Sequence, residues 1–247
     1  MQIIEGRNPV IEALRAGRPI SRILMDRNAQ LQGAAAQILQ LAKSRGVMVE
    51  MVDKQIIDRQ SVTGSSQGVI AFAAAKDYVG LDDLFNISRE QREPALYLVL
   101  DGIEDPHNLG AMLRTAEATG VHGVVIRERR AVGLTPVVVK ASAGAVEYIP
   151  VAMVTNISQA IIALKKNSVW VTGIDMAGEQ HYSRVDFNLL TAIVIGGEGK
   201  GLSELARKRC DLIASIPMKG KVSSLNASVA AAVVMYEALR QRTLKKA

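Results

Sequence analysis

The sequence has little cysteine, little histidine and few aromatic side chains. Its 247 residues include one cysteine, Cys210, three histidines, and only 4% of phenylalanine, tryptophan and tyrosine. A single cysteine excludes an intrachain disulfide and is typical of a reducing compartment. The histidines (His107, His122 and His181) lie far apart without ligand spacing, so we expect no zinc or iron site. The core must be mainly aliphatic.

Long apolar runs are also absent. No stretch approaches the roughly 18 residues that a membrane-spanning helix requires, and the N-terminal segment MQIIEGRNPVIEALRAGR has no apolar signal core. With 49% hydrophobic and 22% charged residues, the chain has the composition of an ordinary folded protein. We therefore expect a cytoplasmic protein with no membrane partner.

Positive charge is in excess, with a net charge of +6. Residues 1–75 carry +3, residues 76–93 carry −2 and residues 94–247 carry +5. A basic surface permits nucleic-acid binding, although many basic proteins bind none. This pattern predicts a small domain over residues 1–75, an acidic linker over 76–93 and a larger domain over 94–247.

The first 75 residues alternate short helices and strands. Asn8 and Pro9 are typical of an N-cap and a first helical residue, for a helix that reaches Gly17. Another predicted helix ends at Gly46. The expected strands cover residues 20–25, 47–52 and 68–75, and the second helix covers residues 31–45. These elements form a small α/β unit.

From residue 95 the chain becomes a regular strand–helix alternation. Several strands are continuous apolar runs, as in a parallel sheet covered on both faces. The fold class is therefore α/β, with a larger parallel-sheet domain at the C-terminus. The predicted strands cover residues 96–100, 124–127, 146–151, 169–174, 192–196 and 212–217, and the predicted helices cover residues 109–119, 158–166, 202–208 and 224–244.

Ligands of open parallel sheets gather beyond the carboxyl ends of the strands, and three loops there carry candidate site residues. The first follows the strand 96–100 and runs DGIEDPHNLGAMLR. Asn108 is placed to cap the next helix, and Arg114 follows close to two turns later, so both could face one site. The simpler alternative is a helix cap and a surface arginine.

The second loop, IVIGGEGKGL, takes a buried strand into four glycines around Glu198. Glycines allow a backbone to approach a ligand closely. Leu202 stands where a dinucleotide fingerprint needs its third glycine, and Gly201 follows Lys200 where a phosphate-binding loop needs serine or threonine. The loop is therefore neither motif, and a plain glycine-rich turn is the alternative.

The third loop, IPMKGKVSSLNAS, precedes a helix rich in small residues. The N-terminus of a helix offers unpaired N–H groups that suit a carboxylate or a phosphate. Ser224 or Asn226 is placed to cap this helix. A capping role is compatible with a second role in ligand binding.

Taken in order, the segments NLGAMLRTAEATG, IVIGGEGKGL and IPMKGKVSSLNASVAAAVVMYE resemble the three signature motifs of the SpoU/TrmH family of SPOUT methyltransferases. The resemblance covers about residues 95–243. The segment GRNPVIEALRAGR and the small unit around it are similar to the branch that methylates a guanosine ribose in bacterial 23S ribosomal RNA.

The resemblance implies a trefoil-knotted C-terminal domain that binds S-adenosylmethionine in a bent shape, a homodimer, and an RNA-binding N-terminal domain. The implied function is methylation of a ribose 2′-hydroxyl in structured RNA, favouring a guanosine of 23S rRNA. Val233 and Val234 of the last helix are candidate dimer contacts. The candidate contacts to RNA phosphates are the arginines Arg7, Arg18, Arg22 and Arg27.

The resemblance also implies site residues by motif position. Arg114 would orient the 2′-hydroxyl or a phosphate and stabilise the developing alkoxide. A role as general base is disfavoured, because a guanidinium stays protonated. Ser224 or a water would relay the proton, and no metal is needed. The implied catalytic residues are Asn108, Arg114, Glu198, Ser224 and Asn226, and the implied cofactor-binding residues are Gly196, Gly197, Ile216 and Leu225.

Three alternatives stay open at this point. One is a ribose 2′-O-methyltransferase that acts on tRNA. Another is a SPOUT enzyme that methylates a base nitrogen, although Asn108 with Arg114 favours a ribose oxygen. The third is a non-catalytic RNA-binding or ribosome-assembly protein, against which the presence of Arg114 and Asn226 argues.

Overall fold

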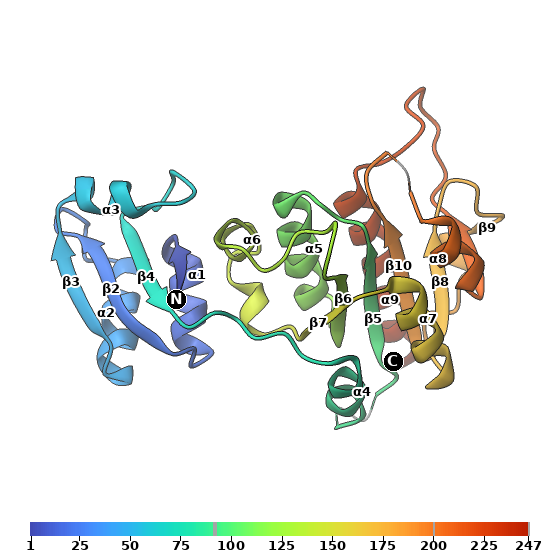
Figure 1. Ribbon diagram of the computed structural model, residues 1–247, viewed down its shortest axis with the longest axis horizontal. Coiled ribbons are helices and arrows are strands. Elements are labelled where there is room, and N and C mark those ends of the chain that lie inside the picture. Colours follow the sequence, from blue (N-terminus) through green and yellow to red (C-terminus); the bar gives the residue numbers. More distant parts are fainter. Residues whose placement is uncertain (91–92, 200, 247) are drawn as a thin grey trace. The chain divides into compact units, whose positions relative to one another are not determined.

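The computed structural model describes residues 1–90, 93–199 and 201–246 (Figure 1). The chain divides into two compact units. The first combines Met1–Asp77 with Leu134–Tyr148, and the second combines Tyr78–Gly133 with Ile149–Ala247. None of the helices among the described residues has both the length and the apolar character needed to cross a bilayer.

The first unit is a mixed four-stranded sheet with the strand order β1-β4-β2-β3. Strand β4 runs antiparallel to β1 and β2, and β3 runs parallel to β2. The predicted α/β character is confirmed, although β1 and α3 were not predicted. The elements are β1 (Gln2–Glu5), α1 (Arg7–Arg15), β2 (Ile20–Asp26), α2 (Ala34–Arg45), β3 (Met48–Val52), α3 (Lys54–Gln60), β4 (Val69–Ala73), α6 (Pro136–Ala141) and the 3-10 helix η1 (Ala145–Glu147).

In the first unit, glycine marks the start of α1 and the end of α2, whereas the polar residue expected to cap α1 does not mark its start. The predicted N-cap at Asn8 is wrong, because α1 begins at Arg7 and Gly6 holds the N-cap position with φ of 96°. The predicted end of α2 is confirmed, since Gly46 adopts the left-handed conformation there, with φ of 66°. Glycine adopts positive φ without the steric cost that a side chain adds.

Residues 134–148 join the first unit although they follow β6 of the second unit in the chain. Glu147 forms an ion pair with Arg18 at 2.6 Å, and their side chains are only 2% and 5% exposed. Arg18 also donates to the carbonyl oxygen of Ala74 at 2.7 Å. The prediction that Arg18 contacts RNA is therefore wrong, because its guanidinium is buried against its own chain. The predicted strand over 146–151 is also wrong, since a 3-10 helix occupies residues 145–147.

A buried carboxylate fastens the loop after α3 to β1. Glu5 is 0% exposed and accepts hydrogen bonds from the Ser61 hydroxyl at 2.7 Å and from the Val62 amide. The amide and hydroxyl of Thr63 also donate to it. Burial raises the pKa of this carboxyl, but the hydrogen bonds outweigh burial and hold its pKa below the usual 4.5. The ionised form is therefore the one that the fold stabilises.

Replacing Glu5 with glutamine is expected to destabilise the first unit by about 3 kcal/mol at pH 7, because an NH₂ group then faces buried donors. Since the folded pKa lies below 4.5, the carboxylate stabilises the fold above that pH and loses its effect as the pH falls through the folded pKa. The difference between the two proteins should therefore begin to shrink below pH 4.5 and disappear once the pH lies below the folded pKa. Amide hydrogen exchange across β1 and β4 measures the difference.

The matched control is Glu50→Gln, which removes a half-exposed carboxylate that lies 3.7 Å from Arg22 on the same sheet. A surface pair of this kind contributes about 0–1 kcal/mol. Equal exchange rates at pH 7 for the wild type and Glu5→Gln would contradict the assigned role of Glu5.

The second unit is built on a parallel sheet with the strand order β7-β6-β5-β10-β8-β11-β9. Every paired neighbour in it is parallel, which confirms the predicted sheet. Its elements are α4 (Leu81–Glu90), β5 (Leu96–Asp101), α5 (Pro106–Ala118), β6 (Gly123–Arg127), β7 (Val151–Val154), α7 (Ile157–Lys166), β8 (Trp170–Ile174), β9 (Gln180–His181), the 3-10 helix η2 (Tyr182–Arg184), β10 (Thr191–Gly196), α8 (Glu204–Arg209), β11 (Leu212–Ser215) and α9 (Ala227–Lys246).

Helices cover both faces of this sheet (Figure 1). Helices α4, α7 and α8 contribute to one apolar cluster with the sheet, while α5 and α9 pack against each other. All residues of β5 and β10 are buried as a result. Residues 76–93, expected to be a linker, contain α4, whose Leu84 and Phe85 lie in this cluster. Residues 91–92 of that segment lie outside the described residues.

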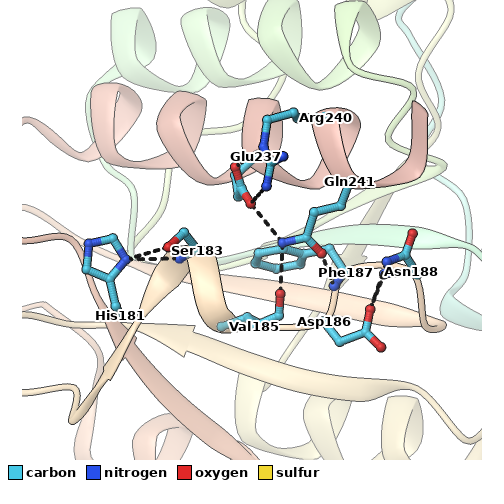
Figure 2. Close-up of polar contacts among 9 residues, drawn as sticks. All are labelled: His181, Ser183, Val185, Asp186, Phe187, Asn188, Glu237, Arg240 and Gln241. Atoms are coloured by element: carbon cyan, nitrogen blue, oxygen red, sulfur yellow. Dashed lines mark hydrogen bonds and ion pairs between the residues drawn. The ribbon is translucent and has the colours of Figure 1, made fainter. Parts of the chain in front are cut away.

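The C-terminal helix is fastened to the segment that leads into β10. Figure 2 shows Gln241 accepting a hydrogen bond from the Phe187 amide at 2.9 Å and donating to the Val185 carbonyl at 3.0 Å. Arg242 donates to the carbonyl oxygens of Phe187 at 2.8 Å and Leu189 at 3.0 Å. These bonds satisfy the backbone of a short irregular segment and fix α9 along the sheet.

Candidate active site

The candidate site lies where the two central strands end. Strands β5 and β10 pair in register and finish together at Asp101 and Gly196. Asp101 joins the loops that follow, because its carboxylate accepts from the Ser203 amide at 2.8 Å and its carbonyl from the Gly197 amide at 2.9 Å. Since β6 and β7 continue the sheet on one side and β8 and β11 on the other, this is a topological switch point, where ligands bind.

The loop after β10 requires glycine for reasons of space. A Cβ on Gly196 would lie 2.0 Å from the carbonyl carbon of Gly201, and one on Gly197 would lie 2.4 Å from the carbonyl oxygen of Gly102. The Gly201 amide donates to the Gly197 carbonyl at 3.1 Å, which closes the loop. Lys200 lies outside the described residues. Glycine at these two positions therefore lets the loop fold back on itself and pack against the backbone that follows β5.

A cavity of about 360 Å³ opens against this loop. Its volume suits a small organic ligand, and its wall combines glycine backbone, aliphatic side chains and two carboxylates. The predicted residues Gly196, Gly197, Ile216 and Leu225 all line it, as do Glu198 and Ser224. The complete lining is Ile174, Asp175, Met176, Ile195, Gly196, Gly197, Glu198, Gly199, Gly201, Arg207, Ile216, Met218, Ser223, Ser224, Leu225, Ala227 and Ala230.

Three of the predicted catalytic side chains meet beside the cavity. The amide nitrogens of Asn108 and Asn226 both donate to Oε1 of Glu198, the second at 3.3 Å. Asn226 also caps α9, because its side-chain oxygen accepts from the amides of Ser228 at 2.9 Å and Val229 at 3.3 Å. The cluster thus joins the start of α5, the glycine loop and the start of α9.

Two expectations about the first motif need correction. Asn108 does not cap α5, because Asp105 holds the N-cap position and accepts from the His107 amide at 3.0 Å. Asn108 and Arg114 do not share a face, since six residues at about 100° each leave them about 120° apart. Asn108 is 6% exposed, whereas Arg114 is exposed and lies outside the cavity lining. Arg114 makes no ion pair or side-chain hydrogen bond within the described part of the chain.

Three further side chains in the cavity wall, Asp175, Met176 and Arg207, lie outside the predicted set of site residues. Asp175 accepts from the Ala177 amide at 2.9 Å and lies 3.6 Å from the guanidinium of Arg207. Asp175 directly follows β8, so the rule that pointed to the other loops applies to it as well. Arg207 lies on α8 and has no comparable sequence signal.

Neither His122 nor Cys210 lines the cavity. Within residues 1–90, 93–199 and 201–246, no three acidic, histidine or cysteine side chains gather as metal ligands would. His122 is buried, which lowers its pKa, and its Nδ1 accepts from the Leu96 amide at 3.2 Å. Burial raises the pKa of Cys210 to about 12, so this thiol stays protonated.

The fold and the site together define a class: a doubly wound α/β protein that binds a small molecule at the switch point of its sheet, beside an Asn–Glu–Asn cluster. Known proteins narrow this class. Residues 95–236 match the model of the SpoU rRNA methylase family, and residues 3–79 match the model described as RNA 2′-O ribose methyltransferase substrate binding.

Full-length relatives agree with these matches. YacO of Bacillus subtilis, whose name assigns it to the TrmH family of tRNA/rRNA methyltransferases, is 47% identical over 96% of this chain and 94% of its own. The chain belongs to the SpoU/TrmH family of RNA methyltransferases, as the three motifs predicted.

Solved structures show the same fold. AviRb of Streptomyces viridochromogenes, a SpoU methyltransferase crystallised with AdoMet, matches with a TM-score of 0.81 and 28% identity over 98% of this chain and 90% of its own. A structure described as an RNA 2′-O ribose methyltransferase matches with a TM-score of 0.80 and 28% identity over 98% of this chain and 88% of its own.

Proposed function

We propose that the protein transfers a methyl group from S-adenosylmethionine to a ribose 2′-hydroxyl of structured RNA, with a guanosine of 23S rRNA as the favoured target. The observation that carries this proposal is the cavity at the switch point with the Asn108–Glu198–Asn226 cluster at its side. The AdoMet complex of AviRb supports S-adenosylmethionine as the cofactor. The descriptions of the substrate-binding family model and of the second solved structure support the ribose 2′-oxygen as the methylated atom.

The cavity fits this cofactor in size and chemistry. Its volume of about 360 Å³, its aliphatic wall and its glycine backbone suit a nucleoside joined to an amino acid. Backbone groups of Gly196, Gly197, Ile216 and Leu225 would hold the molecule, and Asp175 offers a carboxylate to its hydroxyl or ammonium groups. When bound, the cofactor supplies a methyl group already activated by a positively charged sulfur. We also propose that the chain around this loop forms a trefoil knot.

The protein side chains would align the RNA oxygen and stabilise charge on it. Glu198, held by Asn108 and Asn226, is fixed at the rim and would orient the groups next to the reacting oxygen. Ser224 lines the cavity and would pass on the 2′-hydroxyl proton directly or through water. Arg114 would stabilise the forming alkoxide from the surface of α5, where its side chain is exposed.

A homodimer is part of the proposal. Helix α9 exposes Val229 at 47% and Tyr236 at 54%, with Val233 half-buried between them. These positions follow helical spacing and form an apolar stripe suited to a second copy. Val234 is 0% exposed and packs inside its own subunit, so the expectation that it contacts a partner is wrong. Sedimentation at micromolar concentration tests the association.

A transfer assay with mapping of the product tests the function. Protein-free transcripts of 23S rRNA and of tRNA are incubated with the protein and methyl-labelled cofactor, and the labelled RNA is then hydrolysed with alkali. A 2′-O-methyl group blocks cleavage at the next phosphodiester, because the 2′-oxygen is the nucleophile of that cleavage. We expect label in 23S rRNA at one resistant guanosine.

The other outcomes separate the alternatives. Label confined to tRNA would assign the protein to tRNA modification, and label on a base with normal alkaline cleavage would assign it to base-nitrogen methylation. If the protein binds RNA and the cofactor but transfers no methyl group, it is a non-catalytic RNA-binding protein.

A further inference from the structure

The loop after β6 is a second feature at the same edge of the sheet, and the proposed reaction does not use it. Residues 127–130 of this loop read Arg-Glu-Arg-Arg, so it carries three guanidinium groups and one carboxylate. Glu128, Arg129 and Arg130 are exposed. Within the described residues, neither Arg129 nor Arg130 forms an ion pair or side-chain hydrogen bond.

The backbone of this loop is fixed on both sides of the exposed arginines. The Glu128 amide donates to the Val154 carbonyl at 2.9 Å, and the Val132 amide donates to the Ile103 carbonyl at 3.0 Å. The second bond ties the loop to the β5–α5 connection, which leads into the helix that carries Asn108. The arginines are therefore presented from a fixed backbone and are not carried by a loose loop.

Two local features of this loop are energetically unfavourable. Arg130 has φ of 56°, a conformation that costs free energy for a residue with a long side chain. The Nε atom of Arg127 is buried and has no hydrogen-bond partner within the described part of the chain. A buried N–H that lacks an acceptor is also unfavourable. Backbone strain and buried polar groups without a partner are both found preferentially at functional sites.

The register places this loop close to the proposed reaction centre. Val125 of β6 pairs with Val99 of β5, so Arg127 stands level with Asp101 two residues further on. Asp101 in turn pairs with Gly196. Two strand spacings separate Arg127 from the glycine loop, a distance of about 10 Å. A polynucleotide covers that distance within a few nucleotides.

Building on the proposed function, we infer that Arg127, Arg129 and Arg130 form a phosphate-binding site for the RNA strand that flanks the methylated nucleotide. Guanidinium groups bind phosphates bidentately, and a fixed loop loses little entropy on binding. The catalytic unit thus contributes to RNA binding itself, in addition to the N-terminal unit. Arg127 positions the loop and reaches the phosphate nearest the centre, while Arg129 and Arg130 bind its neighbours.

The test compares the double variant R129A/R130A with K166A/R209A. The control removes the same charge from exposed positions at the ends of α7 and α8, which precede strands and so lie at the opposite edge of the sheet. Binding of a labelled 23S rRNA transcript is measured from 50 to 200 mM salt. We expect R129A/R130A to weaken binding about tenfold at 100 mM and to reduce the salt slope by about 1.5, whereas the control changes neither.

Arg130→Gly gives a second readout that a structural role cannot produce. Glycine relieves the positive φ, so this variant should melt at the same temperature as the wild type or higher, and still bind RNA more weakly. Wild-type-like binding by both R129A/R130A and Arg130→Gly, in a protein that binds and methylates RNA, would overturn this inference alone. A wild type that neither binds RNA nor transfers methyl would instead overturn the proposed function.

Discussion

Replacing Arg114 with alanine is expected to lower the single-turnover rate of methyl transfer about a hundredfold or more, close to 3 kcal/mol of transition-state stabilisation. The 2′-oxygen gains negative charge as its proton leaves, so an interaction with that oxygen is stronger in the transition state than in the ground state. The loss should therefore fall on turnover and leave cofactor affinity unchanged. Single-turnover kinetics with saturating RNA and cofactor measure it.

Two further variants separate this role from simpler ones. Arg114→Lys should recover little activity, because lysine keeps the charge but lacks the planar fork that fixes geometry. Arg209→Ala, which removes an exposed arginine at the far edge of the sheet, should react at the wild-type rate. If Arg114 only anchors a phosphate, its loss would weaken RNA binding and leave the rate at saturation normal. If Arg114→Ala changes neither the single-turnover rate nor the affinity for RNA, Arg114 is a surface arginine without a role in the reaction.

Replacing Gly196 with alanine is expected to weaken cofactor binding at least a hundredfold. The new Cβ would lie 2.0 Å from the carbonyl carbon of Gly201 and 2.3 Å from the amide nitrogen of Leu202, both of them backbone atoms. The loop must then open, and the bond from the Gly201 amide to the Gly197 carbonyl is lost. Overpacking of this kind lowers the free energy of unfolding by about 1–3 kcal/mol. We expect β10 to stay folded in this variant. Calorimetry on the full chain measures the affinity.

Gly220→Ala is the control for the glycine prediction. Its Cβ would meet nothing closer than an amide nitrogen at 4.0 Å, and it lies in the loop that supplies the other wall of the cavity. It should bind the cofactor as the wild type does. Circular dichroism confirms that each variant is folded. Near-normal affinity in a folded Gly196→Ala protein would place the cofactor somewhere other than the glycine loop.

The features that the sequence predicts well are those set by neighbouring residues. Continuous apolar runs predict the buried strands β5 and β10, because a parallel sheet covered on both faces favours apolar residues along the whole strand. The glycine run after β10 predicts a close-approach loop for the same local reason. Asp175 also directly follows a strand, β8, but a single carboxylate at that position is a weak sequence signal for a ligand site.

Features that depend on distant parts of the chain were predicted poorly. The contact between Asn108 and Glu198 joins residues 90 positions apart, and only the resemblance to known motifs suggested that they share a site. The acidic charge of residues 76–93 suggested a linker and masked the apolar face of α4, formed by Leu84 and Phe85. Several polar residues precede this helix, so the sequence pattern does not separate Asn108 from Asp105, which is the N-cap in the structure.

The pairing of Arg18 with Glu147 affects how the protein is made. Ribosomes add about 5–20 residues each second, so roughly 4 to 14 s pass between the synthesis of residue 77 and that of residue 148. During this interval the first unit lacks α6 and the acidic partner of Arg18. A buried charge without its partner is destabilising by about 3–5 kcal/mol. The N-terminal sheet is therefore translated first, but it matures only after β5 and β6 of the methyltransferase sheet have also been translated.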